Sequence, residues 1–237
     1  MPEFRERLIV ALDVSSAAAA QKIVAAVGDS AHLFKVGMQL YTAEGPQVVR
    51  DLIASGRHVF LDLKYHDIPN TVAAAVKEAA KLGVRMLTVH AAGSAKMLHA
   101  AVEAAKSANS STIVLAATVL TSMDDRELEM AGVFEPLTDH VRRLAALAVM
   151  SGCQGIVASA QEAASLRKEL GTHFVIVTPG VRPAGAAHGD QARVVTPAEA
   201  IHAGANFIVV GRPITEAADP AAAAREILAE MRAKAHV

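Results

Sequence analysis

The sequence predicts an α/β protein built as a single (β/α)8 barrel, the TIM-barrel fold, with residues 1–237 in one domain. Short apolar runs alternate eight times with Ala-rich stretches of helical character, and the length of 237 residues is near the ~250 residues typical of this barrel. Polar residues follow nearly every apolar run, as expected where the C-terminal ends of barrel strands form one functional rim. An open, doubly wound sheet is the alternative fold, and the gathering of polar residues at one rim favours the barrel.

Each predicted strand is a run of four to seven mainly apolar residues bounded by glycine or polar residues. The runs lie at 8–12, 33–36, 58–64, 86–89, 112–117, 155–158, 174–177 and 206–210. The polar or turn-forming residues at their C-terminal ends are Asp13, Lys35, Asp62, Lys64, His90, Thr118, Ser159, Pro179 and Gly211. The sequence assigns no role to His90 or Ser159.

Helices are predicted at 15–27, 45–56, 69–83, 95–107, 137–150, 161–170, 196–204 and from 219 onward. Capping signals mark several starts, among them a capping box at 196–199 and the pair Asp219-Pro220. A glycine between helix and next strand indicates a left-handed residue at five helix ends: Gly56, Gly83, Gly152, Gly171 and Gly204. Two connections are longer, namely 120–133, whose mixture of polar and apolar residues allows a short helix, and the Gly-rich segment 179–195.

The composition is that of a soluble globular chain, with 52% hydrophobic residues, 20% charged residues and a net charge of −1. This balance lacks the basic surface that nucleic acids or anionic membranes attract, so we expect neither as a partner. No apolar run approaches the ~18 residues of a membrane span, and residues 1–7 lack the apolar core of a signal peptide, which predicts a cytoplasmic protein. A lone Cys153 excludes an intrachain disulfide, and we expect it to be a buried apolar residue.

Four charged residues of alternating sign finish the first three predicted strands. Strand alternation puts Asp62 and Lys64 on one face of their strand and the neighbouring leucines on the other. Barrel closure would bring Asp13 and Lys35 to the same wall, where each charge needs a partner because burying an unpaired charge is costly. Lys64 between carboxylates should stay protonated and act as a proton donor. A weak surface salt bridge or a structural ion network is the alternative interpretation.

A second set of residues suits a phosphate group. Gly211 followed by Arg212 offers unobstructed backbone N–H groups and a guanidinium after the last strand, where barrels often bind phosphate. The segment 179–195 has the length and polarity of a lid that adds Arg182 and Gln191 to the same ligand. An ordinary tight turn and an irregular connection are the alternatives.

The stretch DLKYHDIPNT at 62–71 resembles the D-x-K-x-x-D-I-P-N-T signature of the orotidine 5′-monophosphate decarboxylase family. Shorter matches run in order along the chain: LD at 12–13, KVG at 35–37, LTS at 120–122, TPGVRP at 178–183, GDQ at 189–191 and VGRP at 210–213. The resemblance therefore covers the chain from the first to the last predicted strand.

The resemblance implies decarboxylation of orotidine 5′-monophosphate to uridine 5′-monophosphate and CO2, the last step of de novo pyrimidine nucleotide synthesis, without metal or cofactor. It implies that Lys64 protonates C6, that Asp62 faces the departing carboxylate, and that Lys35 and Asp13 bind ribose hydroxyls. It also implies a homodimer whose active site is shared across the interface, with Asp67 reaching into the partner's site. The implied catalytic set is Lys64, Asp62, Asp67 and Lys35, and the implied substrate-binding set is Asp13, Lys35, Asp62, Ile68, Thr71, Thr121, Pro179, Arg182, Gln191, Gly211 and Arg212.

Two rival functions remain. The sister activities, a magnesium-dependent 3-keto-L-gulonate 6-phosphate decarboxylase and a hexulose-phosphate synthase, carry D-x-K-x-x-D but need a metal-binding carboxylate at the end of the second strand. That position here is Lys35, whose positive charge would repel the metal. A non-catalytic sensor of a phosphate ligand is the other rival, and it would have no need of Lys64.

Overall fold

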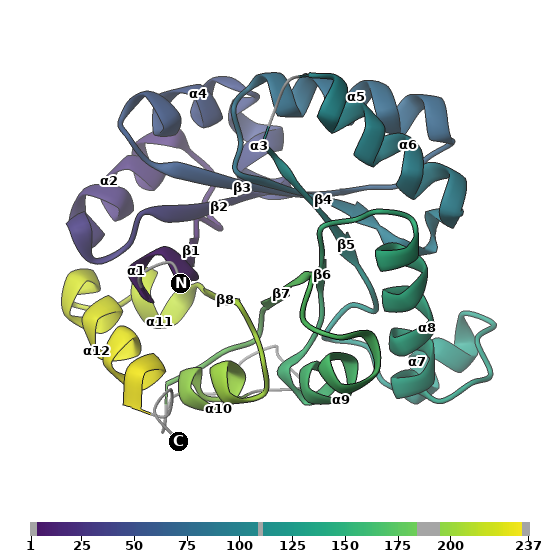
Figure 1. Cartoon of the computed structure of the whole chain (residues 1–237). Helices are drawn as coiled ribbons and strands as arrows, with labels where there is room; N and C mark the ends of the chain where they lie inside the picture. The colour runs from purple at the N-terminus through teal and green to yellow at the C-terminus, as the bar shows by residue number, and fades with distance from the viewer. Residues whose placement is uncertain (1–3, 109–110, 184–194, 234–237) are drawn as a thin grey trace.

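Eight parallel strands close into a barrel in chain order, and the last strand is hydrogen-bonded back to the first (Figure 1). The computed structural model describes residues 4–108, 111–183 and 195–233. The strands are β1 (Leu8–Ala11), β2 (Leu33–Gly37), β3 (His58–Tyr65), β4 (Met86–His90), β5 (Ile113–Ala117), β6 (Gly155–Val157), β7 (Val175–Thr178) and β8 (Phe207–Val210). The predicted (β/α)8 barrel is confirmed.

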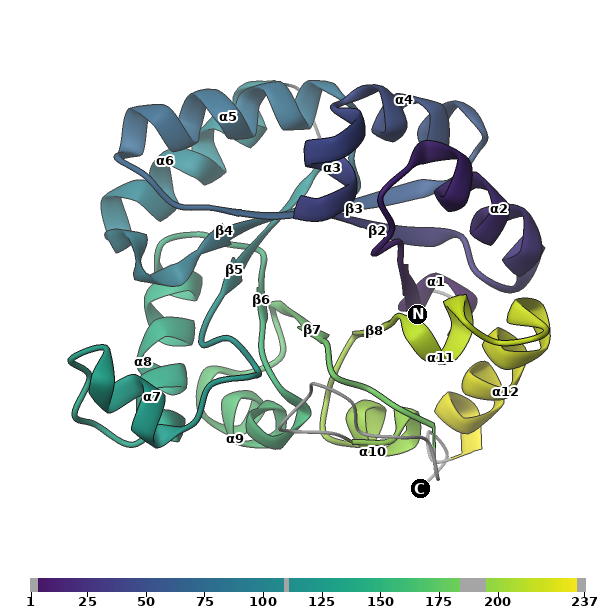
Figure 2. The same ribbon diagram turned by 180° about the vertical axis from the view of Figure 1, so that it is seen from behind.

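Helices surround the barrel on its outside, as Figures 1 and 2 show from opposite sides. They are α1 (Phe4–Arg7), α2 (Ala17–Val27), α3 (Met38–Glu44), α4 (Gln47–Ala54), α5 (Pro69–Lys81), α6 (Ser94–Ser107), α7 (Asp125–Met130), α8 (Leu137–Met150), α9 (Ala160–Leu170), α10 (Pro197–His202), α11 (Arg212–Thr215) and α12 (Pro220–Ala233), with short 3-10 turns η1 (Gly28–Ser30) and η2 (Ala91–Gly93). None of the helices within the described ranges is long and apolar enough to cross a membrane.

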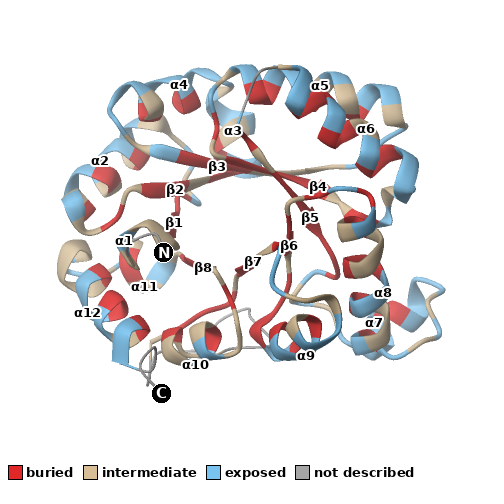
Figure 3. Ribbon diagram, viewed as in Figure 1, coloured by how far each residue is buried: buried red, intermediate tan, exposed pale blue. Residues whose placement is uncertain are grey.

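Alternation along the strands separates two apolar cores. Side chains that face the barrel axis, such as Ile9, Leu33 and Phe60, form the interior cluster, and each fully buried large side chain contributes roughly 1.5–3 kcal/mol. Their neighbours, such as Val10, face outward and pack against the helices. Figure 3 shows the result, with buried residues along the strands and on the inner sides of the helices. Because inward positions recur every second residue, Lys35 comes two residues after Leu33 and faces the axis at the rim.

The expected helix-terminating devices are present. The glycines predicted to end helices, Gly56, Gly83, Gly152, Gly171 and Gly204, all have positive φ. Thr196 and Glu199 form the predicted capping box at the start of α10, and the Asp219 carboxylate accepts a hydrogen bond from the Ala222 N–H at 2.8 Å. These local signals are confirmed because they depend only on neighbouring residues.

Short helices account for most of the differences between the predicted and the observed secondary structure. The possible helix within 120–133 exists as α7, with its own capping box at Asp124 and Glu127. Three short helices were not predicted from the sequence: α1, α3 and α11, which have four, seven and four residues. Elements of one or two turns are too short to display a helical period, so apolar spacing could not reveal them.

Candidate active site

Four charged side chains form a continuous chain of ion pairs on one wall of the rim. Lys35 Nζ lies 2.8 Å from Asp13 Oδ1 and 3.8 Å from Asp62 Oδ2, and Lys64 Nζ lies 2.8 Å from Asp62 Oδ1. The two central side chains are largely buried, at 12% exposure for Lys35 and 14% for Asp62, whereas Asp13 is 60% exposed. Alternating charge offsets the cost of burying Lys35 and Asp62, because each has an opposite charge on two sides.

Gly37 allows the first of these pairs to form. A Cβ atom at this position would lie 2.9 Å from Lys35 Nζ and 3.4 Å from Asp13 Oδ1. A side chain there would therefore displace the ammonium from its carboxylate.

The end of β3 departs from a regular strand. Leu61 is paired with Leu87 and Tyr65 with Val89, so three residues of β3 lie opposite the single residue Thr88 of β4. Lys64 adopts a left-handed φ of 50° within this irregularity, a conformation that costs a non-glycine residue about 1–3 kcal/mol. The prediction that Asp62 and Lys64 meet is correct, but simple strand alternation is not the full reason, because the irregularity also turns the lysine toward the carboxylate.

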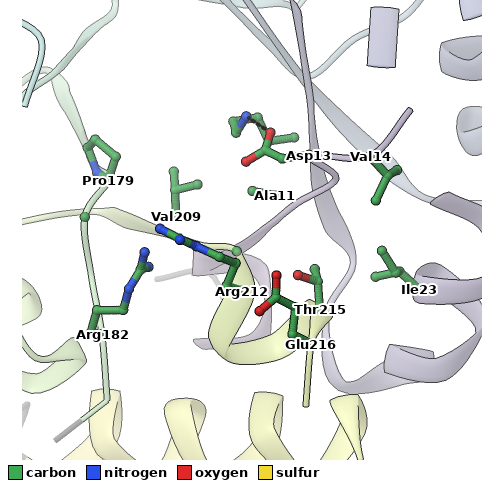
Figure 4. Close-up of a pocket in the computed structure, with 13 residues that line it drawn as sticks. Ala11, Asp13, Val14, Ile23, Pro179, Arg182, Val209, Arg212, Thr215 and Glu216 are labelled. Atoms are coloured by element: carbon green, nitrogen blue, oxygen red, sulfur yellow. Dashed lines mark hydrogen bonds and ion pairs between the residues drawn. The ribbon is translucent and has the colours of Figure 1, made fainter. Parts of the chain in front are cut away.

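A cleft adjoins this wall and has two connected parts. The first, of about 520 Å³, lies between the ends of β1 and β8 and the segment after β7. Arg182 and Arg212 point into it from different elements, as Figure 4 shows. Burial and then the nearby Arg212 lower the pKa of the Arg182 guanidinium. Two arginines beside the backbone of Gly211 suit a dianionic group such as phosphate.

The second part, of about 300 Å³, lies over the mouth of the barrel. Asp62 and Lys64 from β3 line it, together with Thr121 and Ser122 from the segment after β5. Lys35 borders both parts, as do Pro179 and Val209. One ligand could therefore extend from the arginines past Lys35 to Lys64.

The structure does not bring every candidate residue into this cleft. Asp67, Ile68 and Thr71 are exposed on the turn after β3 and at the start of α5, and they line neither part. The Asp67 carboxylate accepts a hydrogen bond from the Ile68 N–H at 2.6 Å, and Ile68 is 66% exposed. Gln191 lies outside the described residues. The functional roles of all these residues stay predictions.

Two rim residues without a predicted role have local structural contacts. His90 stacks on His66 with ring centroids 5.1 Å apart, and burial, then His66 and Lys64, lower the pKa of His90. Ser159 caps α9 by accepting a hydrogen bond from the Gln161 N–H.

Cys153 is buried, as predicted, and burial raises the pKa of its thiol to about 12.

Sequence reasoning missed several residues of the cleft wall. Val209 faces inward from β8, and Thr215 and Glu216 come from α11 and its end. Val209 could have been found from strand alternation, because it precedes Gly211 by two residues. Thr215 and Glu216 carried no signal, because α11 itself was not predicted.

Among the described residues, no group of three or more His, Cys, Asp or Glu side chains is arranged so that it could hold a metal ion.

Comparison with known proteins identifies relatives along nearly the whole chain. Residues 6–227 match the sequence model of the Orotidine 5′-phosphate decarboxylase / HUMPS family. The chain is 53% identical over 227 residues to the orotidine 5′-phosphate decarboxylase of Halorhodospira halophila, covering 96% of each chain. It is 54% identical over 224 residues to that of Anaeromyxobacter dehalogenans, covering 94% of this chain and 97% of the relative.

A solved structure agrees with the sequence comparisons. The crystal structure of orotidine 5′-phosphate decarboxylase from Lactobacillus acidophilus superimposes with a TM-score of 0.87 at 39% identity, covering 96% of this chain and 100% of the other. The family-model match over residues 6–227 includes the charged wall and both arginines. This chain belongs to the orotidine 5′-phosphate decarboxylase / HUMPS family.

Proposed function

We propose that this protein decarboxylates orotidine 5′-monophosphate to uridine 5′-monophosphate and CO2, the last step of de novo pyrimidine nucleotide synthesis. The observation that carries the proposal is the ion-pair chain Asp13–Lys35–Asp62–Lys64 at one end of a cleft whose other end holds Arg182 and Arg212. A nucleotide has a matching layout, with an anionic phosphate at one end and the reacting base at the other.

The substrate lies along the cleft with its phosphate against Arg182, Arg212 and the Gly211 backbone. Lys35 and Asp13, at the junction of the two parts, bind the ribose hydroxyls. Thr121, which lines the same part of the cleft as Lys64 and Asp62, contacts the pyrimidine base of the substrate. Phosphate binding remote from the reacting carbon supplies binding energy that holds the base against the charged wall.

The chemistry breaks the bond between C6 and the carboxylate carbon. CO2 leaves, and the electron pair of the broken bond stays on C6. The ammonium group of Lys64 then gives a proton to C6, which completes uridine 5′-monophosphate, and the neutral amine regains a proton from solvent. A carbanion in the ring plane has little resonance stabilisation, so a cation already in place is the main source of stabilisation.

Asp62 orients that cation and faces the departing carboxylate. Its Oδ1 accepts a hydrogen bond from Lys64 Nζ at 2.8 Å, which holds the ammonium group at the inner end of the cleft. Repulsion between Asp62 and the substrate carboxylate is relieved when CO2 leaves, so it favours the transition state over the bound substrate.

We also propose a homodimer with a shared active site. Asp67 and Ile68 are exposed and line neither part of their own cleft, and Met38, which follows the neighbouring strand β2, is also largely exposed. The exposed apolar side chains of Ile68 and Met38 suit contact with a second copy of the chain. The Asp67 of that copy would extend the charged wall, and its Ile68 and Thr71 would line the cleft. Cytoplasmic location stays a prediction from the sequence.

The test follows the loss of substrate absorbance with purified protein, with and without exhaustive chelation, and with Lys64→Ala as the inactive control. We expect full turnover after chelation and a loss of at least about 100-fold in Lys64→Ala, the lower range for a lost general acid. Activity that required added Mg²⁺ would contradict the proposal and favour the sister sugar-phosphate enzymes. Nucleotide binding without turnover would favour a sensor.

A further inference from the structure

Thr88 lies directly beneath the charged wall without reaching the cleft. It stands two residues after Met86, whose side chain belongs to the barrel interior, so alternation along β4 also turns Thr88 toward the barrel axis. The residue has 0% exposure and lines neither part of the cleft. A ligand in the cleft therefore cannot touch it directly.

The Thr88 hydroxyl connects the two members of the reactive pair. Its Oγ1 accepts a hydrogen bond from the Lys64 backbone N–H at 2.8 Å and donates one to Asp62 Oδ1 at 3.0 Å. Each bond uses a different capacity of the hydroxyl, one lone pair and the single proton. A valine in this position would have nearly the same shape and neither bond.

The first bond supports the irregular end of β3. Thr88 is the one residue of β4 that lies opposite Asp62, Leu63 and Lys64. Where three residues oppose one, the regular ladder cannot satisfy every backbone group, and the Thr88 hydroxyl accepts from the Lys64 N–H. This bond holds the left-handed backbone from which the Lys64 side chain starts.

The second bond sets the rotation of the Asp62 carboxylate. Oδ1 accepts from both Thr88 Oγ1 and Lys64 Nζ, while Oδ2 lies 3.8 Å from Lys35 Nζ. Two donors on one oxygen prevent the carboxylate from turning about its last bond. Each carboxylate oxygen is thus directed to a different lysine.

We infer that Thr88 is a positioning residue for decarboxylation, acting through Lys64 and Asp62, an inference that rests on the proposed function. From beneath the cleft, it fixes the position of the Lys64 ammonium group relative to the Asp62 carboxylate. Because it does not contact substrate, its loss should affect the chemical step more than nucleotide binding.

The test compares three variants by kcat, KM and affinity for uridine 5′-monophosphate. Thr88→Val should lower kcat roughly 10- to 100-fold, the range for losing one hydrogen bond to a charged group, with KM and product affinity within about threefold of wild type. Thr88→Ser keeps the hydroxyl and should retain most of kcat. Thr112→Val is the matched control, because the buried Thr112 hydroxyl donates to the Val84 carbonyl below the strands, at 2.6 Å. It should lower stability and leave kcat unchanged.

A second measurement does not depend on activity. In protein labelled with ¹⁵N-lysine, hydrogen exchange of the Lys64 amide should be at least about tenfold faster in Thr88→Val than in wild type, since the amide loses its acceptor. Thr112→Val should leave that rate unchanged. Wild-type kcat in Thr88→Val, an unchanged exchange rate, or an equal loss of kcat in Thr112→Val would each overturn the inference.

Lys64→Ala separates the two possible failures. If Lys64→Ala is inactive while Thr88→Val turns over at the wild-type rate, the positioning role alone is overturned. If the wild-type protein does not turn over orotidine 5′-monophosphate, the proposed function fails, and the positioning role fails with it. If Lys64→Ala turns over at the wild-type rate, the role of Lys64 as proton donor fails instead, and the positioning role again fails with it.

Discussion

Lys35 is the charged residue that, among the described residues, lines both parts of the cleft. It borders the arginine-lined part and the part over the barrel mouth, and it contacts a carboxylate on each side, Asp13 and Asp62. A cation here favours an anionic ligand that spans both parts. Its positive charge would repel Mg²⁺, so we expect the reaction to need no metal.

Arg212 should distinguish nucleotide from nucleoside. Replacing it with alanine removes a charge-assisted contact to phosphate, so we expect affinity for uridine 5′-monophosphate to fall by roughly 1.5–3 kcal/mol while affinity for uridine barely changes. Titration calorimetry with both ligands measures this difference. Arg142→Ala is the control, because Arg142 lies on the outer helix α8 and pairs with Asp139. Equal losses for the two ligands would show that Arg212 acts away from the phosphate.

Cys153 should make the protein less stable in alkali. Burial raises the pKa of its thiol from about 9 to about 12, so between these values the unfolded chain loses a proton that the folded chain keeps. The contribution of the buried thiol to the free energy of unfolding is therefore fully present below about pH 9. It is lost as the pH rises toward 12, by up to about 1.4 kcal/mol per pH unit.

Urea unfolding of wild type and Cys153→Ala at about pH 8 and about pH 10 measures this effect. Burial raises the pKa of Tyr65 to about 12 as well, and its effect is common to both proteins. At the lower pH we expect wild type to have a larger free energy of unfolding than Cys153→Ala, because the alanine leaves a cavity. At the higher pH we expect this difference between the two proteins to be smaller. A constant gap would show that the thiol does not titrate differently in the two states.

At the scale of elements, strand ends position the site, and the end of β3 does so in a way the sequence could not reveal. Alternation correctly predicted that Asp62 faces the rim, because that rule is local. The left-handed Lys64 depends on Thr88 of a different strand, and no pattern within 58–64 encodes which residue β4 places opposite. Thr88 itself looked like an ordinary strand residue, since its function depends on barrel closure.

Gly155 should be intolerant of a side chain because β6 is tightly enclosed between β5 and β7. A Cβ atom there would lie 2.5 Å from the Val175 carbonyl oxygen and 2.6 Å from Leu115 Cδ2. We expect Gly155→Ala to lower the free energy of unfolding by about 1–3 kcal/mol through overpacking, measured by urea unfolding at fixed protein concentration.

Gly56→Ala is the matched control for Gly155→Ala. Gly56 has a φ of 79° and open space around its position, so alanine there brings backbone strain without a clash. Gly56→Asn should recover part of the loss, because asparagine tolerates the left-handed region, whereas Gly155→Asn should be worse than alanine. Wild-type stability of Gly155→Ala would show that β5 and β7 can separate at no cost.

At the scale of the whole molecule, the barrel converts positions far apart in the chain into one site. Asp13 and Arg212 are separated by nearly the full sequence but line the same part of the cleft, because β8 pairs with β1. Sequence reasoning could predict this convergence, since strand order and inward alternation follow from general rules. The role of Asp67 in a partner's cleft was implied only by the family resemblance and stays a prediction, because strand order and alternation do not give the surface of a partner.

Mixed dimers test whether the site is shared between subunits. Lys64→Ala and Asp67→Ala should each be nearly inactive as homodimers. In a mixed dimer, the cleft of the Asp67→Ala chain keeps its own Lys64 and receives an intact Asp67 from its partner, whereas the other cleft lacks both residues. After equal mixing with subunit exchange, half of the dimers are mixed and half of their sites are intact, so activity should recover to roughly a quarter of wild type.

The control is Lys64→Ala mixed with a differently tagged Lys64→Ala, which should recover nothing. Native mass spectrometry of the tagged chains establishes that subunits have exchanged. If Asp67 and Lys64 served the same subunit's cleft, every site in a mixed dimer would still lack one of them. Exchange without recovery would therefore mean that the exposed Asp67 acts on its own cleft, by a movement of the turn after β3, and the shared site would have to be abandoned.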